Sequence, residues 1–180
     1  EIRSHYYSSR DYSAQCASPI AMMPVGNSIT RGAASGVNDP TQQISYRKDL
    51  WDLLNRGGYS MDFVGSQTDG KFYAGCDAQH EGRSGWTADQ IRDNILAWLN
   101  STPADVILLH VGTNDIVQGV PDHNEVNQIL DQIDSYEASS GNAVTVVLAR
   151  ILLVGNNNEA ATTQFNNDVA LLVQNRIAKG

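Results

Sequence analysis

The sequence predicts an α/β protein with a doubly wound parallel sheet, a three-layer sandwich in which helices cover both faces of the sheet. Two observations predict this fold. Short apolar runs at residues 20–25, 61–64, 106–111 and 143–154 alternate with segments of helical periodicity, and such alternation is typical of parallel strand–helix units. The last run is continuously apolar, as expected of a parallel strand that is buried on both faces.

Three long segments lack such periodicity. Residues 1–18 are polar and are expected to form an irregular leader, and residues 31–42 are rich in the Gly, Asn and Pro that are typical of loops. Residues 65–86 form an unusually long connection. Connections above about 12–15 residues in a compact domain are commonly functional or disordered.

Four helices are predicted between and after the strands. The first covers Ser45 to Arg56, where apolar residues recur at helical spacing before Gly57-Gly58. The second opens at the capping box Thr87-Ala88-Asp89-Gln90. The third ends before Gly141, and the fourth covers residues 161–178.

The bulk composition argues against two kinds of partner. The net charge is −8, from 20 acidic and 12 basic residues, so no basic patch is available to neutralise the phosphates of nucleic acid or of an anionic membrane surface. No apolar run approaches the roughly 20 residues that a membrane span needs. A chain of 180 residues with 41% hydrophobic residues and no internal repeat or linker is expected to form one domain with a substantial core.

The two cysteines, Cys16 and Cys76, are too few to define a disulfide framework. They form one bridge that closes a long loop, which a secreted protein would favour, or they are two buried thiols. The sequence leaves both alternatives open. Neither cysteine stands in a strand–turn–helix context with a histidine, so cysteine-based catalysis is not expected.

Two polar turns directly follow predicted strands. Ser28 lies in Gly26-Asn27-Ser28-Ile29-Thr30 and Asn114 lies in Gly112-Thr113-Asn114-Asp115. Because the carboxyl ends of parallel strands share one edge of the sheet, both side chains should face one crevice. Acyl transfer needs a nucleophile, a base and donors for the developing oxyanion. Ser28 offers a hydroxyl and its own N–H, and Asn114 offers an amide. Gly85 offers an N–H that a substrate can approach closely, because glycine has no Cβ.

These motifs resemble those of the SGNH (GDSL-type) hydrolases. The block around Ser28 is similar to the first block of that superfamily, with Asn27 where Asp is commoner, while Gly85 matches the second block and Gly112 to Asp115 match the third. The resemblance spans about residues 20–175. Three further segments narrow it to carbohydrate esterase family three, the acetylxylan esterases: Met23-Pro24, Asp62-Phe63-Val64-Gly65-Ser66, and His80-Glu81-Gly82 leading into Ser84-Gly85-Trp86.

The resemblance implies an SGNH or flavodoxin-like sandwich and a secreted serine esterase. Its substrate would be an acetylated polysaccharide or oligosaccharide such as acetylated xylan, from which it would remove acetyl groups. Ser28 would be the nucleophile, and the Ser28 N–H, the Gly85 N–H and the Asn114 side chain would form the oxyanion hole. No cofactor and no metal ion is implied.

The sequence departs from the family pattern at the expected catalytic base. The fourth signature of the family is Asp-x-x-His near the C-terminus, after a fifth strand, and no such motif stands there before Gly180. Asp77-Ala78-Gln79-His80 has the spacing but lies in the long connection, and His110 is expected to be a satisfied core histidine. We therefore expect the catalytic His and Asp beyond Gly180.

The same departure predicts that residues 1–180 are a single SGNH-like domain that is C-terminally incomplete and nearly inactive alone. Its C-terminal strand and helix would be missing. The run 143–154 would then be a long apolar edge, which natural proteins usually cover.

The remaining candidates are assigned with their alternatives. Trp86 lines the substrate pocket or packs in the core. Glu81 binds substrate or forms a loop salt bridge with Arg83. Asn156 contacts sugar hydroxyls or simply forms the loop that follows a strand. Asp115 is expected to cap the following turn or to hold its loop by hydrogen bonds to backbone N–H groups, rather than to act as an acid or base.

Two other functions stay open. An SGNH-like carbohydrate-binding module without turnover would fit a true absence of the base. A lipid or thioester hydrolase of the same superfamily would need a more apolar pocket than these polar loops suggest. A downstream Asp-x-x-His segment would decide for the enzyme.

Overall fold

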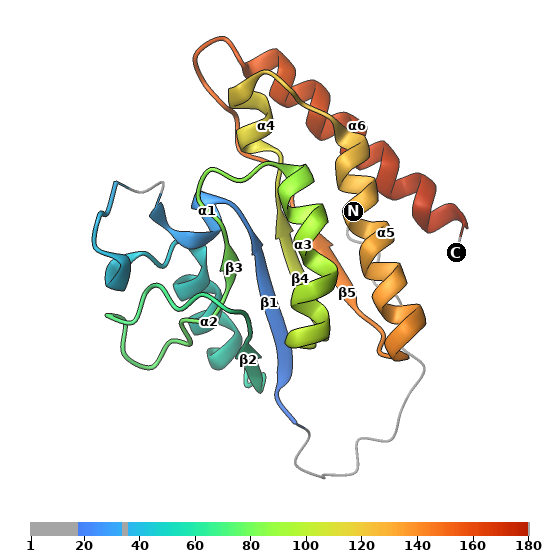
Figure 1. The fold of residues 1–180 in the computed structure, drawn as a ribbon. Coiled ribbons are helices and arrows are strands. Elements are labelled where there is room, and N and C mark those ends of the chain that lie inside the picture. The colour runs from blue at the N-terminus through green and yellow to red at the C-terminus, as the bar shows by residue number, and fades with distance from the viewer. Residues whose placement is uncertain (1–17, 34–35, 180) are drawn as a thin grey trace.

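The computed structural model describes residues 18–33 and 36–179. Cys16 therefore lies outside the described residues, and so does the predicted leader except for its last residue. The described part confirms the predicted fold class, with a parallel sheet and helices on both of its sides (Figure 1). The strands are β1 (Ile20–Gly26), β2 (Met61–Phe63), β3 (Glu81–Gly82), β4 (Val106–His110) and β5 (Thr145–Leu148).

The sheet has the order β2-β1-β4-β5, and β3 also pairs with β1. All of these pairings are parallel. β2 pairs with the first half of β1 and β3 with its last two residues. The carboxyl end of β1 is thus flanked by β3 on one side and by β4 on the other.

Six α-helices and one 3-10 helix accompany the strands in the described residues. α3 and α5 lie side by side in front of the sheet in Figure 1, and α2 lies behind it. The helices are α1 (Ser28–Arg31), α2 (Tyr46–Arg56), α3 (Ala88–Ser101), α4 (Thr113–Gln118), α5 (His123–Ser140) and α6 (Glu159–Lys179), with the 3-10 helix η2 at Pro40–Gln42.

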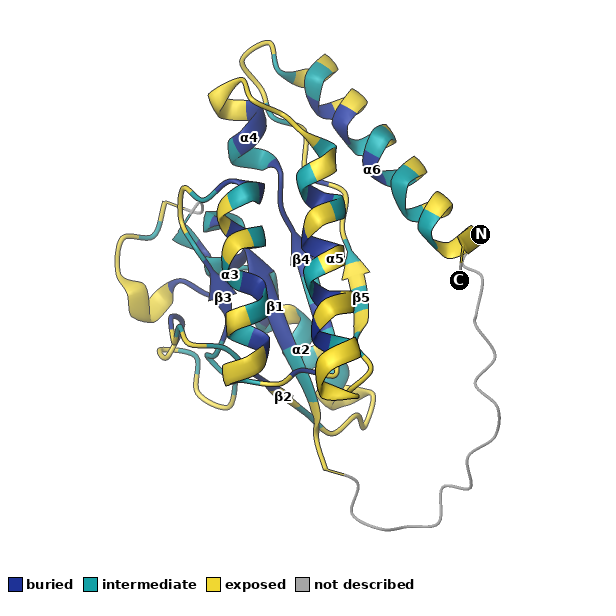
Figure 2. Cartoon of the chain, turned by 45° about the vertical axis from the view of Figure 1, so that its right-hand side comes forward, coloured by how far each residue is buried: buried dark blue, intermediate teal, exposed yellow. Residues whose placement is uncertain are grey.

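The core lies between β1, β4 and the two helices α3 and α5. Their apolar side chains repeat with the period that each element requires, two in the strands and about 3.6 in the helices. Figure 2 shows this buried centre and the exposed outer faces of the helices. The core includes Met23 and Val25 of β1, Ile107 and Leu109 of β4, Ile91, Ile95 and Leu99 of α3, and Val126, Ile129 and Ile133 of α5.

The helix ends follow the sequence signals. Thr87 and Gln90 form the predicted capping box of α3. Gly141 ends α5 in a left-handed conformation with φ of 75°, which glycine adopts at little steric cost.

The fourth predicted strand is corrected by the structure. The run 143–154 contains only the four-residue strand β5, and burial alternates along it rather than being continuous. β5 is the edge of the described sheet, and one of its faces is exposed, with Val147 52% exposed. Beyond it, Leu152 and Leu153 are exposed as well, so the segment is not a strand buried on both faces.

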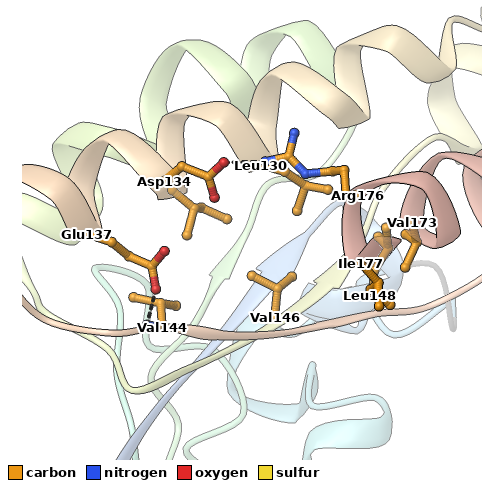
Figure 3. A pocket seen from close by; sticks show the side chains of 10 residues that line it. Leu130, Asp134, Glu137, Val144, Val146, Leu148, Val173, Arg176 and Ile177 are labelled. Atoms are coloured by element: carbon orange, nitrogen blue, oxygen red, sulfur yellow. Dashed lines mark hydrogen bonds and ion pairs between the residues drawn. The ribbon is translucent and has the colours of Figure 1, made fainter. Parts of the chain in front are cut away.

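A groove of about 270 Å³ lies beside this edge, between α5, β5 and α6 (Figure 3). Its floor is apolar, with Val144, Val146 and Leu148. At its rim, Glu137 accepts a hydrogen bond from the Val144 N–H, and Arg176 of α6 pairs with Asp134 of α5. The ion pair ties α6 to α5 across the groove.

None of the helices that the structure describes combines the length and the apolar composition that a membrane span requires.

Candidate active site

Three neighbouring strand ends bring the predicted site residues to one edge of the sheet. Gly26, the last residue of β1, pairs with Gly82 of β3 on one side and with His110 of β4 on the other. Ser28 follows β1 by two residues and Gly85 follows β3 by three, while Asn114 comes four residues after the end of β4. The three residues therefore follow the ends of the neighbouring strands β3, β1 and β4, at one edge of the sheet.

Close approach of these strand ends depends on glycine at two positions. A Cβ on Gly26 would lie 2.4 Å from the His110 carbonyl oxygen and 2.4 Å from Thr30 Oγ1. A Cβ on Gly82 would lie 2.6 Å from the Arg31 backbone nitrogen. A larger residue at either place would push α1, and with it Ser28, away from its neighbours.

Ser28 begins α1 and has a free hydroxyl. Asn27 caps the helix by accepting a hydrogen bond from the Ile29 N–H at 2.9 Å. The Ser28 carbonyl accepts from the Gly32 N–H at 2.8 Å, which closes the single turn. Ser28 is half-buried, and its Oγ has no hydrogen-bond partner among the described residues. The backbone at Ser28 is fixed by these bonds, and its hydroxyl is free to act as a nucleophile.

Gly85 stands at the most open point of the site. Its φ is 83°, and no atom lies within 4 Å of the place where a Cβ would stand. Glycine is needed there for its left-handed backbone. The Trp86 N–H closes the turn on the Arg83 carbonyl at 3.2 Å, so the Gly85 N–H is presented on an exposed turn.

Asn114 is fixed to the Gly85 turn. Its Nδ2 donates to the Trp86 carbonyl oxygen at 2.6 Å. A primary amide has two N–H groups, so the second can donate to another acceptor. This one hydrogen bond joins the end of β4 to the residue that follows Gly85.

Asp115 adds a second connection between the same two segments. Its Oδ1 accepts from the Ala88 N–H, in the first turn of α3, at 3.0 Å. The carboxylate is buried, which raises its pKa, and Oδ2 has no partner among the described residues. Asp115 thus accepts from a backbone N–H, as the sequence predicted, but that N–H belongs to α3 rather than to the loop of Asp115.

The Gly85 turn is supported from behind by Arg83. The Arg83 guanidinium lies 5.6 Å from the centre of the Trp86 ring and 5.1 Å from that of Trp98. The two indoles stack at 5.9 Å. Cation–π contacts of this kind contribute about 0.5–2 kcal/mol. Trp86 is half-buried in this stack, so one face packs on the fold.

Glu81 is engaged by protein groups on both of its oxygens. Oε1 accepts from the Ser66 N–H at 2.6 Å, and Oε2 accepts from Arg83 at 2.5 Å. Its side chain is 2% exposed. The loop salt bridge with Arg83, rather than a substrate contact, is therefore what the structure shows for Glu81.

Asn156 lies away from these contacts, in the exposed loop between β5 and α6. Its φ is 63°, a left-handed conformation that Asn tolerates better than most residues. Within the part of the chain that the structure describes, no hydrogen bond or ion pair joins its side chain to the groups around Ser28. Asn156 comes eight residues after the end of β5.

His80 is not available to Ser28. It is completely buried, and burial together with Arg47, Arg31 and Arg83 lowers its pKa to about 3. Its Nδ1 accepts from the Gly82 N–H at 2.9 Å. In a neutral ring the proton is then on Nε2, which lies 3.3 Å from Asp69 Oδ2. The Asp69 N–H, also 3.3 Å from Nε2, cannot then donate to it.

His110 is buried at the end of β4, as expected, but it is not a satisfied histidine. Its Nδ1 has no hydrogen-bond partner among the described residues, and burial lowers its pKa. His123 lies on the surface at the start of α5, with Nδ1 3.8 Å from Asp168 of α6. Neither environment is that of a histidine activated by a carboxylate next to Ser28.

Arg47 is a structural residue that the sequence interpretation missed. It is the one buried residue of α2, and burial lowers its pKa to about 10. No carboxylate pairs with it among the described residues. Its position one turn before Leu50 and Trp51, on the apolar face of the predicted helix, was the available signal. The guanidinium donates to five carbonyl oxygens, those of Thr30, Arg31, Gln43, Asp69 and Ala78, at 3.0–3.2 Å.

No group of three or more His, Cys, Asp or Glu side chains within the described ranges could hold a metal ion.

The chain is similar to known esterases. It is 30% identical over 182 residues to a multidomain esterase of Ruminococcus flavefaciens, a match that covers 87% of this chain and 22% of that protein. The chain thus spans 22% of the length of this curated relative. No protein-family profile matches the chain.

Two solved structures carry the comparison further. A family 3 carbohydrate esterase of Clostridium thermocellum is 35% identical, with a TM-score of 0.75, and the match covers 90% of this chain and 74% of that one. A family 3 carbohydrate esterase of Talaromyces cellulolyticus is 25% identical, with a TM-score of 0.69, over 87% of this chain and 73% of that one.

A parallel sheet with Ser, Gly and Asn motifs at three neighbouring strand ends defines the class, an SGNH-type hydrolase. The identity and coverage of the Clostridium match define the family. The chain belongs to carbohydrate esterase family 3.

Proposed function

We propose that this chain is the catalytic domain of a serine esterase that removes acetyl groups from a polysaccharide. The observation that carries the proposal is the unpartnered Ser28 hydroxyl at the end of β1, flanked by the Gly85 turn after β3 and by Asn114 after β4. Each element of an acyl-transfer site except the base has a residue at this edge of the sheet.

The reaction proceeds through an acetyl-enzyme. Ser28 Oγ attacks the ester carbonyl carbon and gives its proton to a base, while the carbonyl oxygen becomes an oxyanion. The Ser28 N–H, the Gly85 N–H and the second N–H of Asn114 donate to that oxyanion. The protonated base gives its proton to the sugar oxygen, which leaves. Water then loses a proton to the base and attacks the acetyl carbonyl, acetate is released, and Ser28 Oγ takes the proton back. By family resemblance, the base is the histidine of an Asp-x-x-His segment.

The substrate class follows from the relatives. The neighbours from Clostridium and Talaromyces are described as carbohydrate esterases, and another neighbour as an acetyl esterase. Acetylated xylan is the polymer that the motifs suggest, and the exposed faces of Trp86 and Asn156 are the proposed sugar contacts. A polymeric substrate of this kind lies outside the cell, which is consistent with secretion.

Substitution of the nucleophile tests the proposal. Ser28→Ala should abolish release of acetate from acetylated xylo-oligosaccharides and from a small acetyl ester, because it removes the hydroxyl that would attack the ester carbonyl. The matched control is Ser101→Ala, at the exposed end of α3, which should retain wild-type turnover. Both variants should be measured in the protein at its full natural length. Near-normal turnover by Ser28→Ala would contradict the assignment.

Carbohydrate binding without turnover is the second candidate. The burial of His80 and His110 favours it, because neither can serve as a base for Ser28. In that case the protein at its full natural length would bind xylo-oligosaccharides, yet release no acetate above the Ser28→Ala background.

A further inference from the structure

We propose that a polar groove beside α1 is a subsite for a carboxylate-bearing sugar, such as a uronic acid residue of the polysaccharide chain. The inference rests on the proposed function and adds the chemistry of the glycan to it. The groove has a volume of about 360 Å³ and runs between α1, η2 and the segment that follows β2. Its polar lining includes Arg31, Thr41, Ser66, Gln67, Thr68 and Lys71.

The groove shares α1 with the proposed nucleophile. Arg31 is three residues from Ser28 on the same single-turn helix, which at about 1.5 Å per residue places it roughly 5 Å further along the axis. Ser66, on the opposite wall, accepts a hydrogen bond from Arg83, whose guanidinium supports the Gly85 turn. A glycan whose ester reaches Ser28 can therefore extend its chain into this groove.

Arg31 is held in place before any ligand binds. Its Nε and one terminal nitrogen lie 3.1 and 3.2 Å from the two oxygens of Asp69. Asp69 is itself fixed by the Nε2 of the fully buried His80. A guanidinium has five N–H donors in a fixed fork, so donors remain for a second partner. Preorganised donors of this kind lose little entropy on binding.

The charge of the groove contrasts with that of the whole chain. The chain carries a net charge of −8, yet the groove is lined by two cations and one acid, and because Asp69 pairs with Arg31, the unpaired charge of the lining is the positive charge of Lys71. Lys71 is exposed and forms no ion pair with any residue that the structure describes. The nearby Asp39 carboxylate accepts from the Thr41 N–H and Oγ and does not line the groove.

The two walls of the groove are joined by backbone hydrogen bonds. The Gly70 N–H donates to the Pro40 carbonyl at 2.9 Å, and the Phe72 N–H donates to the Thr41 carbonyl at 2.8 Å. These bonds fix η2 against the segment that carries Lys71. Fixed hydroxyl and amide groups between two cations suit a sugar ring with a carboxylate better than a neutral sugar, for which Lys71 would have no charged partner.

The experiment compares two oligosaccharides that differ only in the carboxylate. One is a xylo-oligosaccharide with a uronic acid substituent, and the other is the same molecule with its carboxylate reduced to the alcohol. Their deacetylated forms are titrated calorimetrically into Ser28→Ala protein, so that binding is read without turnover. We expect the acidic form to bind about tenfold more tightly, the size of one or two charge-assisted contacts. The preference should fall as salt rises, because ionic contacts near the surface are screened.

Lys71→Gln should reduce that preference to about twofold, and Lys71→Arg should restore most of it. Lys71 is exposed, so these changes do not disturb the fold. The matched control is Lys179→Gln at the end of α6, which removes the same charge on the opposite side of the molecule in Figure 1 and should leave the preference at its wild-type value. Equal binding of the two oligosaccharides, or a preference that survives Lys71→Gln, would overturn the subsite. Preferential binding without any acetate release from the wild-type protein would instead overturn only the proposed esterase function.

Discussion

At the scale of single residues, the proposed site combines groups that are fixed with one that is free. Asn114 is anchored to the Trp86 carbonyl and Asp115 to the Ala88 N–H, whereas the Ser28 hydroxyl has no partner among the described residues. Donors fixed in advance stabilise a developing charge without reorganisation. A nucleophile, by contrast, must be free to attack.

Substitution of Asn114 tests whether this residue is one of the fixed donors. Asn114→Ala should lower kcat by about 10²–10³ with little change in KM, because one oxyanion donor acts in the transition state rather than in the ground state. Steady-state kinetics with an acetylated xylo-oligosaccharide measures both constants.

The change also removes the bond to the Trp86 carbonyl, so the thermal unfolding of Asn114→Ala should be recorded beside its kinetics. Asn94→Ala, on the exposed face of α3, removes a comparable amide-to-carbonyl bond away from the site and serves as the control. A defect of Asn114→Ala confined to KM would make Asn114 a substrate-binding residue instead.

At the scale of elements, α3 and α4 are joined through the site. Asp115 lies in the first turn of α4, and the group that it binds opens α3. The Gly85 turn lies directly before α3. The two donors that flank Ser28 are therefore positioned by helices that share one buried hydrogen bond.

Asp115→Ala should destabilise the protein by about 1–3 kcal/mol, since it leaves the buried Ala88 N–H without an acceptor. Asp115→Asn should cost less, because its Oδ1 can still accept. Chemical denaturation measures both, with Asp93→Ala on the exposed surface of α3 as the control. Equal stability of Asp115→Ala and Asp93→Ala would contradict the proposed role of the bond.

Elements with a strong local signal could be predicted from the sequence, and elements set by tertiary contacts could not. β1 and the capping box of α3 were predicted because apolar runs and cap residues act locally. The two-residue strand β3 has no periodicity and exists because the Arg83 N–H donates to the Gly26 carbonyl at 2.8 Å. The strand predicted at 143–154 was longer than the observed β5, because a continuous apolar run does not show which face of the strand is left uncovered.

The same distinction applies to the site. Ser28, Gly85 and Asn114 were found from motifs at strand ends, and their neighbouring placement follows from the parallel sheet. The supporting groups Arg47 and Asp69 were not found, because each contacts residues far away in the sequence. The place of Arg47 on the apolar face of its helix indicates that it is buried, but the local sequence does not indicate which carbonyls it binds.

At the scale of the whole molecule, the long connection between β2 and β3 is held to the rest of the fold by buried polar groups. Arg47 donates to carbonyls within it, those of Asp69 and Ala78, and to carbonyls outside it such as that of Arg31. His80 lies at its end, fully buried. Three arginines around His80 lower its pKa, in addition to burial. The ionisation of a single ring is therefore linked to the stability of the protein.

His80 should make the protein sensitive to acid. The folded-state pKa of about 3 lies below the ordinary value of 6.5, so between these two pH values the unfolded chain binds a proton that the folded protein does not. Stability is therefore full above about pH 6.5 and falls as the pH decreases towards 3. At roughly 1.4 kcal/mol per pH unit, the loss between pH 6.5 and pH 4 is on the order of 3 kcal/mol.

His80→Asn isolates this contribution. Its Oδ1 can accept from the Gly82 N–H as the ring Nδ1 does, but it cannot take up a proton in this range. The variant is expected to be less stable than the wild type at pH 7 through lost packing, so the slope of unfolding free energy against pH decides, not the absolute value. That slope should be shallower than the wild-type slope between pH 6.5 and 4 when measured by urea denaturation.

Other groups, such as Asp115 with its raised pKa, contribute equally to both proteins and cancel. His123→Asn controls for the loss of a histidine at the surface. Parallel curves for the wild type and His80→Asn would mean that the His80 ring is protonated without cost in the folded protein.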